Sequence, residues 1–385
     1  MIGDYKMLLK KKNEEITKPK RVLMVLTALG VSGGVQNKVM DLYKEVDKTR
    51  IQFDFLVHTK DIEGSFEETI ELMGGKVYFF GKFNDIGLFT YIKRLYQLIK
   101  QKNYQAVHSY IGLNDSLILS VAKLAKVRIR ISHVRTNVAK VKKRKVIKPI
   151  FKYLIKRNAT HLLASSTQAG ESLYGKKPFE VIPNALDIHR FMNVKKGETE
   201  NLISKIDLND NMVILGHVGR FTYEKNHDFL LEIAKKLKEQ SFEFKIILVG
   251  DGELRERFEH KLEELNLEQY FYMVGAQSNV EIYYHVFDIL LFPSIHEGFG
   301  NVAVEAQVAK NYVIASDGVS SEVDLGLELV DFVDLDSIEI WLEKIINHHC
   351  KDSIKVTDQQ IKKSLKSRFF DLEQSIEKYY KIYDV

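Results

Sequence analysis

Short apolar runs recur along the first half of the chain, separated by segments whose apolar residues repeat with helical spacing. The first run, at 21–28 (RVLMVLTA), is apolar almost throughout, which is typical of a strand buried on both faces of a parallel sheet. Strands that alternate with helices predict a doubly wound α/β sheet with right-handed crossovers. In this half we expect strands at 21–28, 51–57, 76–80, 106–109, 128–133, 161–164 and 179–182.

The same alternation begins again in the second half, after a polar stretch at 189–211. We interpret this stretch as a linker between two Rossmann-like α/β domains, at 21–188 and 212–367, which follow a basic polar tail at 1–20. The last apolar pattern, from about 357, has helical spacing and predicts a terminal helix. In the second half we expect strands at 212–218, 244–249, 270–274, 287–292, 313–315 and 329–333.

The length and composition are those of a globular protein large enough to bury two hydrophobic cores. The chain has 385 residues, of which 45% are hydrophobic and 28% charged. A single cysteine, Cys350, excludes an intrachain disulfide and favours a reducing compartment. No apolar run approaches the ~20 residues of a membrane span, and the N-terminal tail lacks the apolar core of a signal peptide. We therefore expect a cytoplasmic protein.

Charge is unevenly distributed, although the net charge is only +5. The segment 140–157 holds nine basic and no acidic residues, and its apolar residues recur at helical spacing. It predicts either a surface helix with solvated lysines or a helix that attaches the protein peripherally to anionic lipid on the inner face of the plasma membrane. No nucleic-acid recognition motif accompanies the charge, so we expect no nucleic-acid partner.

The stretch 291–305 (LFPSIHEGFGNVAVE) carries the strongest chemical signal. An apolar strand stops at Pro293, a loop holds Glu297-Gly298-Phe299-Gly300, and a helical pattern begins near Asn301 and contains Glu305. Unpaired amides at a helix N-terminus attract anions, and the two glycines allow close approach of the backbone. The two carboxylates could then hold different parts of one extended, polyhydroxylated anion.

Two further loops follow strand ends. Gly33 and Gly34 lie between the first strand and a helical pattern, an arrangement that cradles phosphate in many α/β proteins or forms a plain tight turn. No acidic residue closes the strand at 51–57, which argues against NAD. In the second half, Arg220 and Lys225 follow the first strand, where a bidentate guanidinium and an ammonium suit a pyrophosphate.

Histidines stand near the carboxyl ends of two strands, the edge where open α/β sheets bind ligands. These are His108 and His133. A lone histidine at such a place is often structural, and we expect that of His108.

The spacing Glu297-x7-Glu305 within P-S-x-x-E-G-F-G resembles the signature of retaining, family 4 type glycosyltransferases with the GT-B fold, particularly the capsular and exopolysaccharide branch. The pattern G-R-x-x-x-E-K-N at 219–226 is similar to the diphosphate site of that family, and P-N-x-x-D at 183–187 to the end of its first domain. The family commonly has glutamate after its glycine pair, whereas this chain has Gln36.

The resemblance implies two facing Rossmann-like domains, with a C-terminal helix at about 368–385 that crosses back to domain one. The second domain would bind a nucleotide sugar and the first an acceptor. Arg220 and Lys225 would stabilise the departing diphosphate, Glu297 would hold the donor sugar and His133 would lie near it, and Glu305 would accept from the ribose. Other implied donor-binding residues are Gly33, Gly34, Gly219, Gly250, Gly252, Gly275, Gly298, Phe299, Gly300 and Asn301.

By the same resemblance the reaction retains anomeric configuration, uses a UDP-sugar and serves capsule or exopolysaccharide synthesis on a lipid-linked, polyprenyl-pyrophosphate acceptor. Two basic side chains make a metal unnecessary, so we expect no metal and no cofactor. The alternatives are a UDP-sugar 2-epimerase of similar fold, a glycosidase that uses the glutamate pair, and a non-catalytic nucleotide-sugar-binding subunit.

Overall fold

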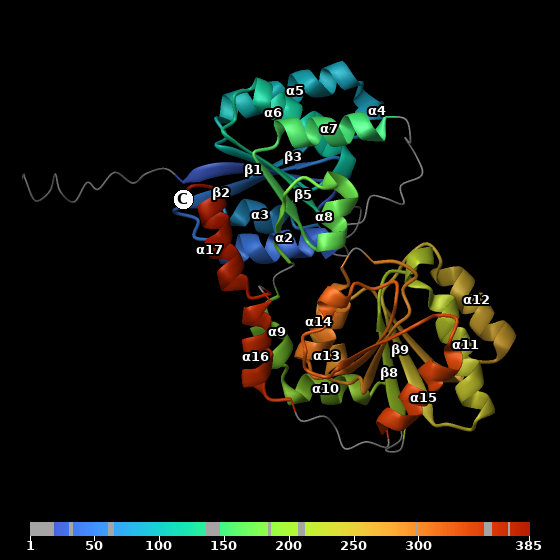
Figure 1. Ribbon diagram of the computed structural model, residues 1–385. Helices are drawn as coiled ribbons and strands as arrows, with labels where there is room; N and C mark the ends of the chain where they lie inside the picture. The colour runs from blue at the N-terminus through green and yellow to red at the C-terminus, as the bar shows by residue number, and fades with distance from the viewer. Residues whose placement is uncertain are drawn as a thin grey trace, which may run out of the picture.

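The computed structural model describes residues 19–30, 34–60, 65–135, 147–183, 186–206, 212–297, 299–349, 356–368 and 370–385. It contains two α/β domains, each built on one parallel sheet covered by helices on both faces (Figure 1). The first sheet has the strand order β3-β2-β1-β4-β5-β6-β7 and the second has the order β10-β9-β8-β11-β12-β13. This confirms the predicted fold of two doubly wound, Rossmann-like domains.

In the first domain the order of strands reverses between β1 (Lys20–Leu26) and β4 (Ala106–Ser109). Such a reversal leaves the carboxyl ends of the two strands open to a ligand, because their helices leave on opposite faces. The other strands are β2 (Ile51–Val57), β3 (Val77–Phe79), β5 (Ile129–Val134), β6 (His161–Ala164) and β7 (Glu180–Val181). The helices are α2 (Gly34–Glu45), α3 (Glu67–Leu72), α4 (Phe83–Ile86), α5 (Leu88–Lys102), α6 (Asp115–Leu124), α7 (Lys148–Asn158) and α8 (Thr167–Tyr174).

The second domain repeats this plan, with its reversal between β8 (Val213–Val218) and β11 (Ile289–Phe292). The other strands are β9 (Phe244–Val249), β10 (Phe271–Gly275), β12 (Tyr312–Ser316) and β13 (Val330–Val333). The helices are α11 (His227–Glu239), α12 (Arg255–Leu265), α13 (Glu281–Tyr284), α14 (Asn301–Val308) and α15 (Ile338–His349). Every predicted strand is present, within two residues of its expected bounds, because a fully buried strand needs a continuous apolar run.

The polar stretch interpreted as a linker contains two short helices among its described residues. It forms α9 (Ile188–Met192) and α10 (Lys196–Ile203). Phe191, Leu202 and Ile206 are buried in the core of the second domain. A few well-spaced apolar residues are enough to dock a short helix, and the polar residues between them hide that spacing in the sequence.

The C-terminal segment crosses from the second domain to the first, as predicted (Figure 1). Helix α16 (Asp358–Ser367) buries Ile361 and Leu365 in the core of the second domain. Helix α17 (Leu372–Ile382) packs on the first domain, where the Tyr380 hydroxyl accepts a 2.7 Å hydrogen bond from the Asp47 amide. The single predicted helical pattern is thus divided between two cores.

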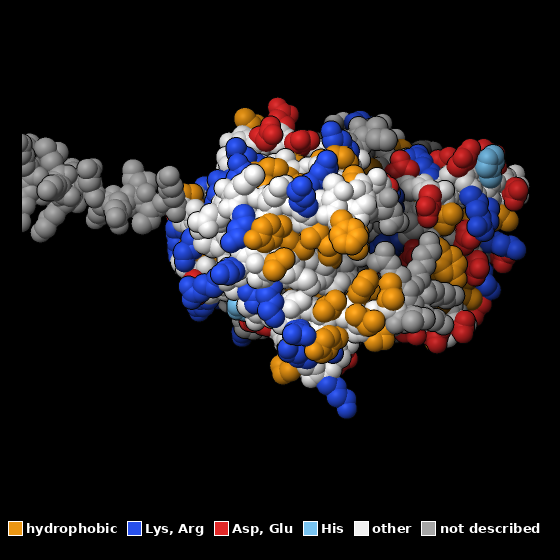
Figure 2. Space-filling model, turned by 90° about the horizontal axis from the view of Figure 1, so that it is seen from above, with side chains coloured by type: hydrophobic (Ala, Val, Ile, Leu, Met, Phe, Trp, Pro, Cys, Tyr) orange, Lys and Arg blue, Asp and Glu red, His pale blue; other side chains and the backbone are white. Residues whose placement is uncertain are grey.

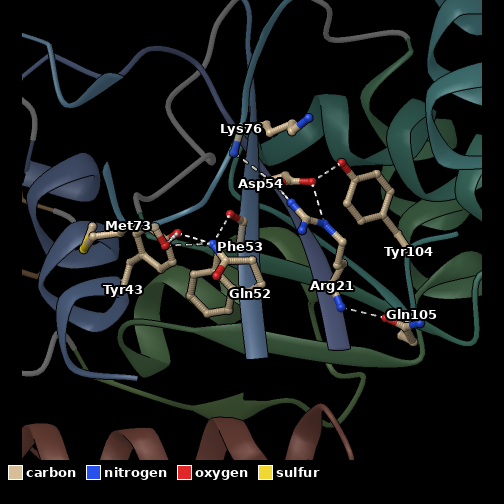
Figure 3. A network of polar contacts seen from close by, with 9 residues as sticks. All are labelled: Arg21, Tyr43, Gln52, Phe53, Asp54, Met73, Lys76, Tyr104 and Gln105. Atoms are coloured by element: carbon tan, nitrogen blue, oxygen red, sulfur yellow. Dashed lines mark hydrogen bonds and ion pairs between the residues drawn. The ribbon is translucent and has the colours of Figure 1, made fainter. Parts of the chain in front are cut away.

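A charged network joins strands of the first sheet around Asp54, whose side chain is fully buried (Figure 3). The carboxylate forms an ion pair with Arg21 of β1 and accepts hydrogen bonds from the Tyr104 hydroxyl (2.6 Å) and the Lys76 amide (2.9 Å). A buried carboxylate is tolerated when all its lone pairs find donors. The network therefore holds β1, β2 and the start of β4 together.

Candidate active site

A lysine and a glutamate meet at the carboxyl edge of the second sheet. Lys225 ends the short 3-10 turn η2 (Tyr223–Lys225) after β8, and its ammonium forms an ion pair with Glu297 in the loop after β11. The exposed fractions of the two side chains are only 20% and 16%. The Ser294 hydroxyl also donates to Glu297 (3.2 Å), and the ammonium lies 4.9 Å from the centre of the Phe292 ring. Two motifs predicted separately thus form one site.

Backbone hydrogen bonds fix the loop that presents Glu297. The Ile295 amide donates to the Glu224 carbonyl (2.8 Å), which ties this loop to the turn carrying Lys225. The Glu297 amide donates to the Gly318 carbonyl (3.1 Å) in the loop after β12. The position of the carboxylate is therefore set by three neighbouring loops rather than by its own side chain alone.

Two buried histidines lie behind Lys225. Burial, with a smaller contribution from Lys225, lowers the pKa of His217 to about 4. Burial, followed by His217 and Lys225, lowers the pKa of His227 to about 2. Both imidazoles are neutral near pH 7, so the cationic charge of this region rests on Lys225 and on Arg220, whose side chain is exposed in the same loop.

Two of the predicted glycines are required by their surroundings. Gly250 has a φ of +151°, and a Cβ there would lie 1.9 Å from the Gly219 carbonyl oxygen. Gly300 has a φ of +107°, and a Cβ would lie 3.0 Å from Val319. Gly300 occupies the N-cap of α14, and no described side chain caps that end. The first turn of α14, which opens with Asn301, therefore begins directly after the loop of Glu297.

The remaining predicted glycines that the structure describes lie in loops or at the ends of helices and strands. Gly219 and Gly252 belong to loops joined by the hydrogen bond from the Phe221 amide to the Asp251 carbonyl (3.1 Å), and Gly275 ends β10. Gly34 is the first residue of α2. Gly33 and Gly298 lie outside the described residues.

Phe299, one of the implied donor-binding residues, has a buried side chain. It is only 3% exposed and packs on Phe370, with ring centres 5.5 Å apart. The ring is therefore part of the core of the second domain. An aromatic residue between two glycines of a loop carries no sequence signal that separates these two roles.

The family resemblance places His133 near the donor sugar. Its ring is fully buried in the first domain, where it lies 5.0 Å from the centre of the Tyr110 ring, and His108 Nε2 lies 3.2 Å from its Nδ1. Tyr383 of the returning helix closes this cluster through a 2.6 Å contact with His108. A contact with a sugar would require this ring to be uncovered, and the assignment of His133 to the site stays a prediction.

The facing edge of the first sheet holds a buried carboxylate, Asp115 at the start of α6. It accepts hydrogen bonds from the hydroxyls of Ser109 and Ser132 (2.6 Å each) and from the Ile111 amide (3.0 Å). Burial raises the pKa of Asp115 to about 7, although these three donors act to lower it. The carboxylate orders the loop after β4 rather than facing solvent.

Two contacts join the domains at these edges. Lys38 of α2 lies 3.3 Å from Glu305 of α14, which also accepts a 3.0 Å hydrogen bond from the Tyr284 hydroxyl. Glu322, in the 3-10 turn η4 (Ser321–Val323), accepts hydrogen bonds from the Thr167 amide at the start of α8 (3.1 and 3.3 Å). Lys38 and Tyr284 were absent from the predicted site, because no motif marks either residue.

Metal ligands and membrane spans were sought in the same residues. The described part of the chain contains no group of three or more His, Cys, Asp or Glu side chains that could hold a metal ion. None of its helices combines the length and the apolar character needed to cross a membrane.

Comparison with known proteins adds independent information. Residues 198–325 match the model of the family Glycosyl transferases group 1. The chain is 31% identical over 376 residues to the putative glycosyltransferase EpsF of Bacillus subtilis, which covers 95% of this chain and 97% of that protein. It is 28% identical to the capsular polysaccharide biosynthesis glycosyltransferase CapH of Staphylococcus aureus, over 74% of this chain and 78% of CapH.

A third relative has a more specific name. The Escherichia coli UDP-Gal:α-D-GlcNAc-diphosphoundecaprenol α-1,3-galactosyltransferase is 27% identical over 55% of this chain and 58% of its own length. Among solved structures, Anabaena HepE in complex with UDP and glucose has a TM-score of 0.77 and 17% identity, over 94% of this chain and 98% of HepE. At this identity, the likeness to HepE shows the fold alone.

Two doubly wound domains, each on a parallel sheet, form the GT-B fold, as the likeness to HepE also shows. The chain belongs to the group 1 glycosyltransferases. The resemblance to the family 4 type, stated from the motifs at 219–226 and 291–305, is thereby confirmed.

Proposed function

We propose that this glycosyltransferase moves a sugar from a UDP-sugar to a lipid-linked, polyprenyl-diphosphate saccharide in capsule or exopolysaccharide synthesis. The transfer would retain anomeric configuration and need no metal. The observation that carries this proposal is the pairing of Lys225 with Glu297 beside the N-terminus of α14. A cation for phosphate and a carboxylate for sugar hydroxyls then lie within one site.

The proposed mechanism follows from the charge that develops on the donor as its sugar–phosphate bond breaks. The bond between the anomeric carbon and the diphosphate oxygen breaks, and a bond to the acceptor oxygen forms. The acceptor's proton passes to the departing diphosphate. Negative charge grows on the diphosphate, where Lys225, Arg220 and the amides of α14 would stabilise it. The metal-independent route is supported by these cations.

The contacts of the Glu297 side chain suit a role in binding the donor. The ion pair with Lys225 and the hydrogen bond from Ser294 orient its carboxylate, and donor phosphate would draw the ammonium away and leave the carboxylate for sugar hydroxyls. A glycosidase needs one carboxyl to act as a proton donor. Both Glu297 and Glu305 instead face an ammonium group, which favours transfer over hydrolysis.

The donor and acceptor classes are supported by relatives. By its name, the Escherichia coli relative uses UDP-galactose and a diphosphoundecaprenol-linked acceptor, and HepE is solved with UDP and glucose. The name of CapH places that relative in capsular polysaccharide synthesis. We extend these classes to this chain because the loops after β8 and β11 supply the charges that such a donor needs.

A transfer assay tests the proposal. The purified chain is incubated with UDP-glucose, UDP-galactose or UDP-GlcNAc and a short polyprenyl-diphosphate saccharide, with and without EDTA. We expect release of UDP that depends on acceptor, an α-linked product by NMR, and undiminished rates in EDTA. UDP-ManNAc formed from UDP-GlcNAc without acceptor would favour the epimerase, and donor binding without turnover would favour a non-catalytic subunit. Activity lost to EDTA and restored by Mn²⁺ would contradict the metal-independent route.

We also propose peripheral attachment to an anionic membrane through the face that carries α5 and α7. Part of the basic segment at 140–157 lies outside the described residues, but α7 exposes Ile150 and Tyr153, each 56% exposed, and α5 exposes Phe89 (87%). Figure 2 looks down on this face and shows apolar and basic side chains interspersed. Basic residues near a lipid surface contribute roughly 1 kcal/mol each, and exposed apolar residues can insert at the interface.

Liposome flotation tests this attachment. We expect the wild type to float with phosphatidylglycerol vesicles and to be released by salt, because the attraction is screened. The double variant Ile150→Ser/Tyr153→Ser should bind several-fold less. The matched control is Ile340→Ser, at a residue of the second domain that is 44% exposed. Equal flotation of all three proteins would remove this face from the proposal.

A further inference from the structure

A lysine of the first domain reaches into the nucleotide side of the second. Lys38 lies on α2, and its Nζ is 3.3 Å from Glu305 Oε1 on α14. The same Nζ is 3.8 Å from Asp41 Oδ2, one turn along α2. The exposed fractions of the three side chains are 9%, 12% and 19%, so the ion pair between domains is largely removed from water.

Lys38 is the cation between two carboxylates, those of Asp41 and Glu305. Burial raises the pKa of Asp41, although Lys38 and Arg190 act to lower it and Glu305 adds to the increase. The Arg190 guanidinium forms an ion pair with Glu281 (2.7 Å), which holds it on the second domain. Two carboxylates from different domains therefore share one ammonium. Removal of that ammonium would leave both poorly compensated.

Glu305 has hydrogen-bonding capacity for a further donor while Lys38 stays bound. Its Oε1 faces Lys38 and its Oε2 accepts from the Tyr284 hydroxyl. Each carboxylate oxygen can accept two hydrogen bonds, so a vicinal diol can add without displacing either partner. The two existing contacts fix the carboxylate in one orientation, which lowers the entropy that a ligand must remove.

We propose that Lys38 is a positioning residue that orients Glu305 for the ribose of the donor and so couples nucleotide binding to closure of the two domains. This inference rests on the proposed function, because it requires a ribonucleotide at Glu305. Lys38 contacts no reacting atom. Its effect would reach the donor through Glu305 and through the relative position of the domains.

Binding of UDP to the full chain, measured by calorimetry, tests this inference. We expect Lys38→Met, which keeps the length of the stem, to weaken UDP binding about 10-fold, within the range of coupling between two sites. Lys38→Arg should recover most of the loss. The matched control is Lys93→Met, at an exposed lysine of α5 in the same domain, which should bind as the wild type does. Small-angle scattering should show UDP compacting the wild type more than Lys38→Met.

A double-mutant cycle separates positioning from a general structural role. If Lys38 acts through Glu305, Lys38→Met should add little to the loss caused by Glu305→Gln, because contacting residues are not additive. Independent, additive losses would overturn the inference. So would equal or tighter UDP binding by Lys38→Met, since the lysine would then be a competitor of the nucleotide. A wild type that binds no UDP would instead refute the proposed donor, and the inference with it.

Discussion

Replacement of Lys225 by alanine is expected to lower kcat by about 10²–10³-fold, the range seen when one preorganised electrostatic donor is removed from an active site. The ammonium is the cation held at the loop of Glu297, and both neighbouring histidines are neutral, so neither can replace its charge. Initial rates of acceptor-dependent UDP release measure the effect.

The variant should keep its fold, because the side chain of Lys225 lies in a loop and is 20% exposed. Circular dichroism and thermal unfolding check this point. Lys235→Ala, at an exposed lysine of α11, is the matched control and should turn over at the rate of the wild type. Turnover of Lys225→Ala within a few-fold of wild type would exclude this lysine from the reaction and with it the proposed site.

Replacement of Asp54 by alanine is expected to lower the free energy of unfolding by about 3 kcal/mol. Breaking a buried ion pair costs roughly 3–5 kcal/mol, and the low end applies because the side chain of Arg21 is 30% exposed. The change also leaves the Tyr104 hydroxyl and the Lys76 amide without their acceptor. Urea-induced unfolding, followed by circular dichroism, measures the loss.

An exposed ion pair provides the contrast. Lys236 and Glu339 form an ion pair at 2.8 Å, but their side chains are 38% and 72% exposed. Glu339→Gln should therefore cost at most about 1 kcal/mol. Equal effects of Asp54→Ala and Glu339→Gln would show that the network in Figure 3 does not hold the first sheet together.

Local patterns accounted for much of the fold and part of the site. The strand ending at Phe292, the start of α14 at Asn301 and the turn carrying Lys225 each follow from a few consecutive residues. In two places one local pattern suits two environments. His133 at a strand end and Phe299 between glycines can each face a ligand or a core, and the structure buries both rings.

The sequence by itself determined the alternation of strands and helices, the places where loops carry glycines and charges, and the family. These follow from periodicity and spacing over short distances. Only the tertiary structure decided which distant residues meet: Lys225 with Glu297, Lys38 with Glu305, and the returning helix α17 with the first domain. The physical reason is that each of these contacts joins segments from different strands or domains, and their approach depends on how whole elements pack.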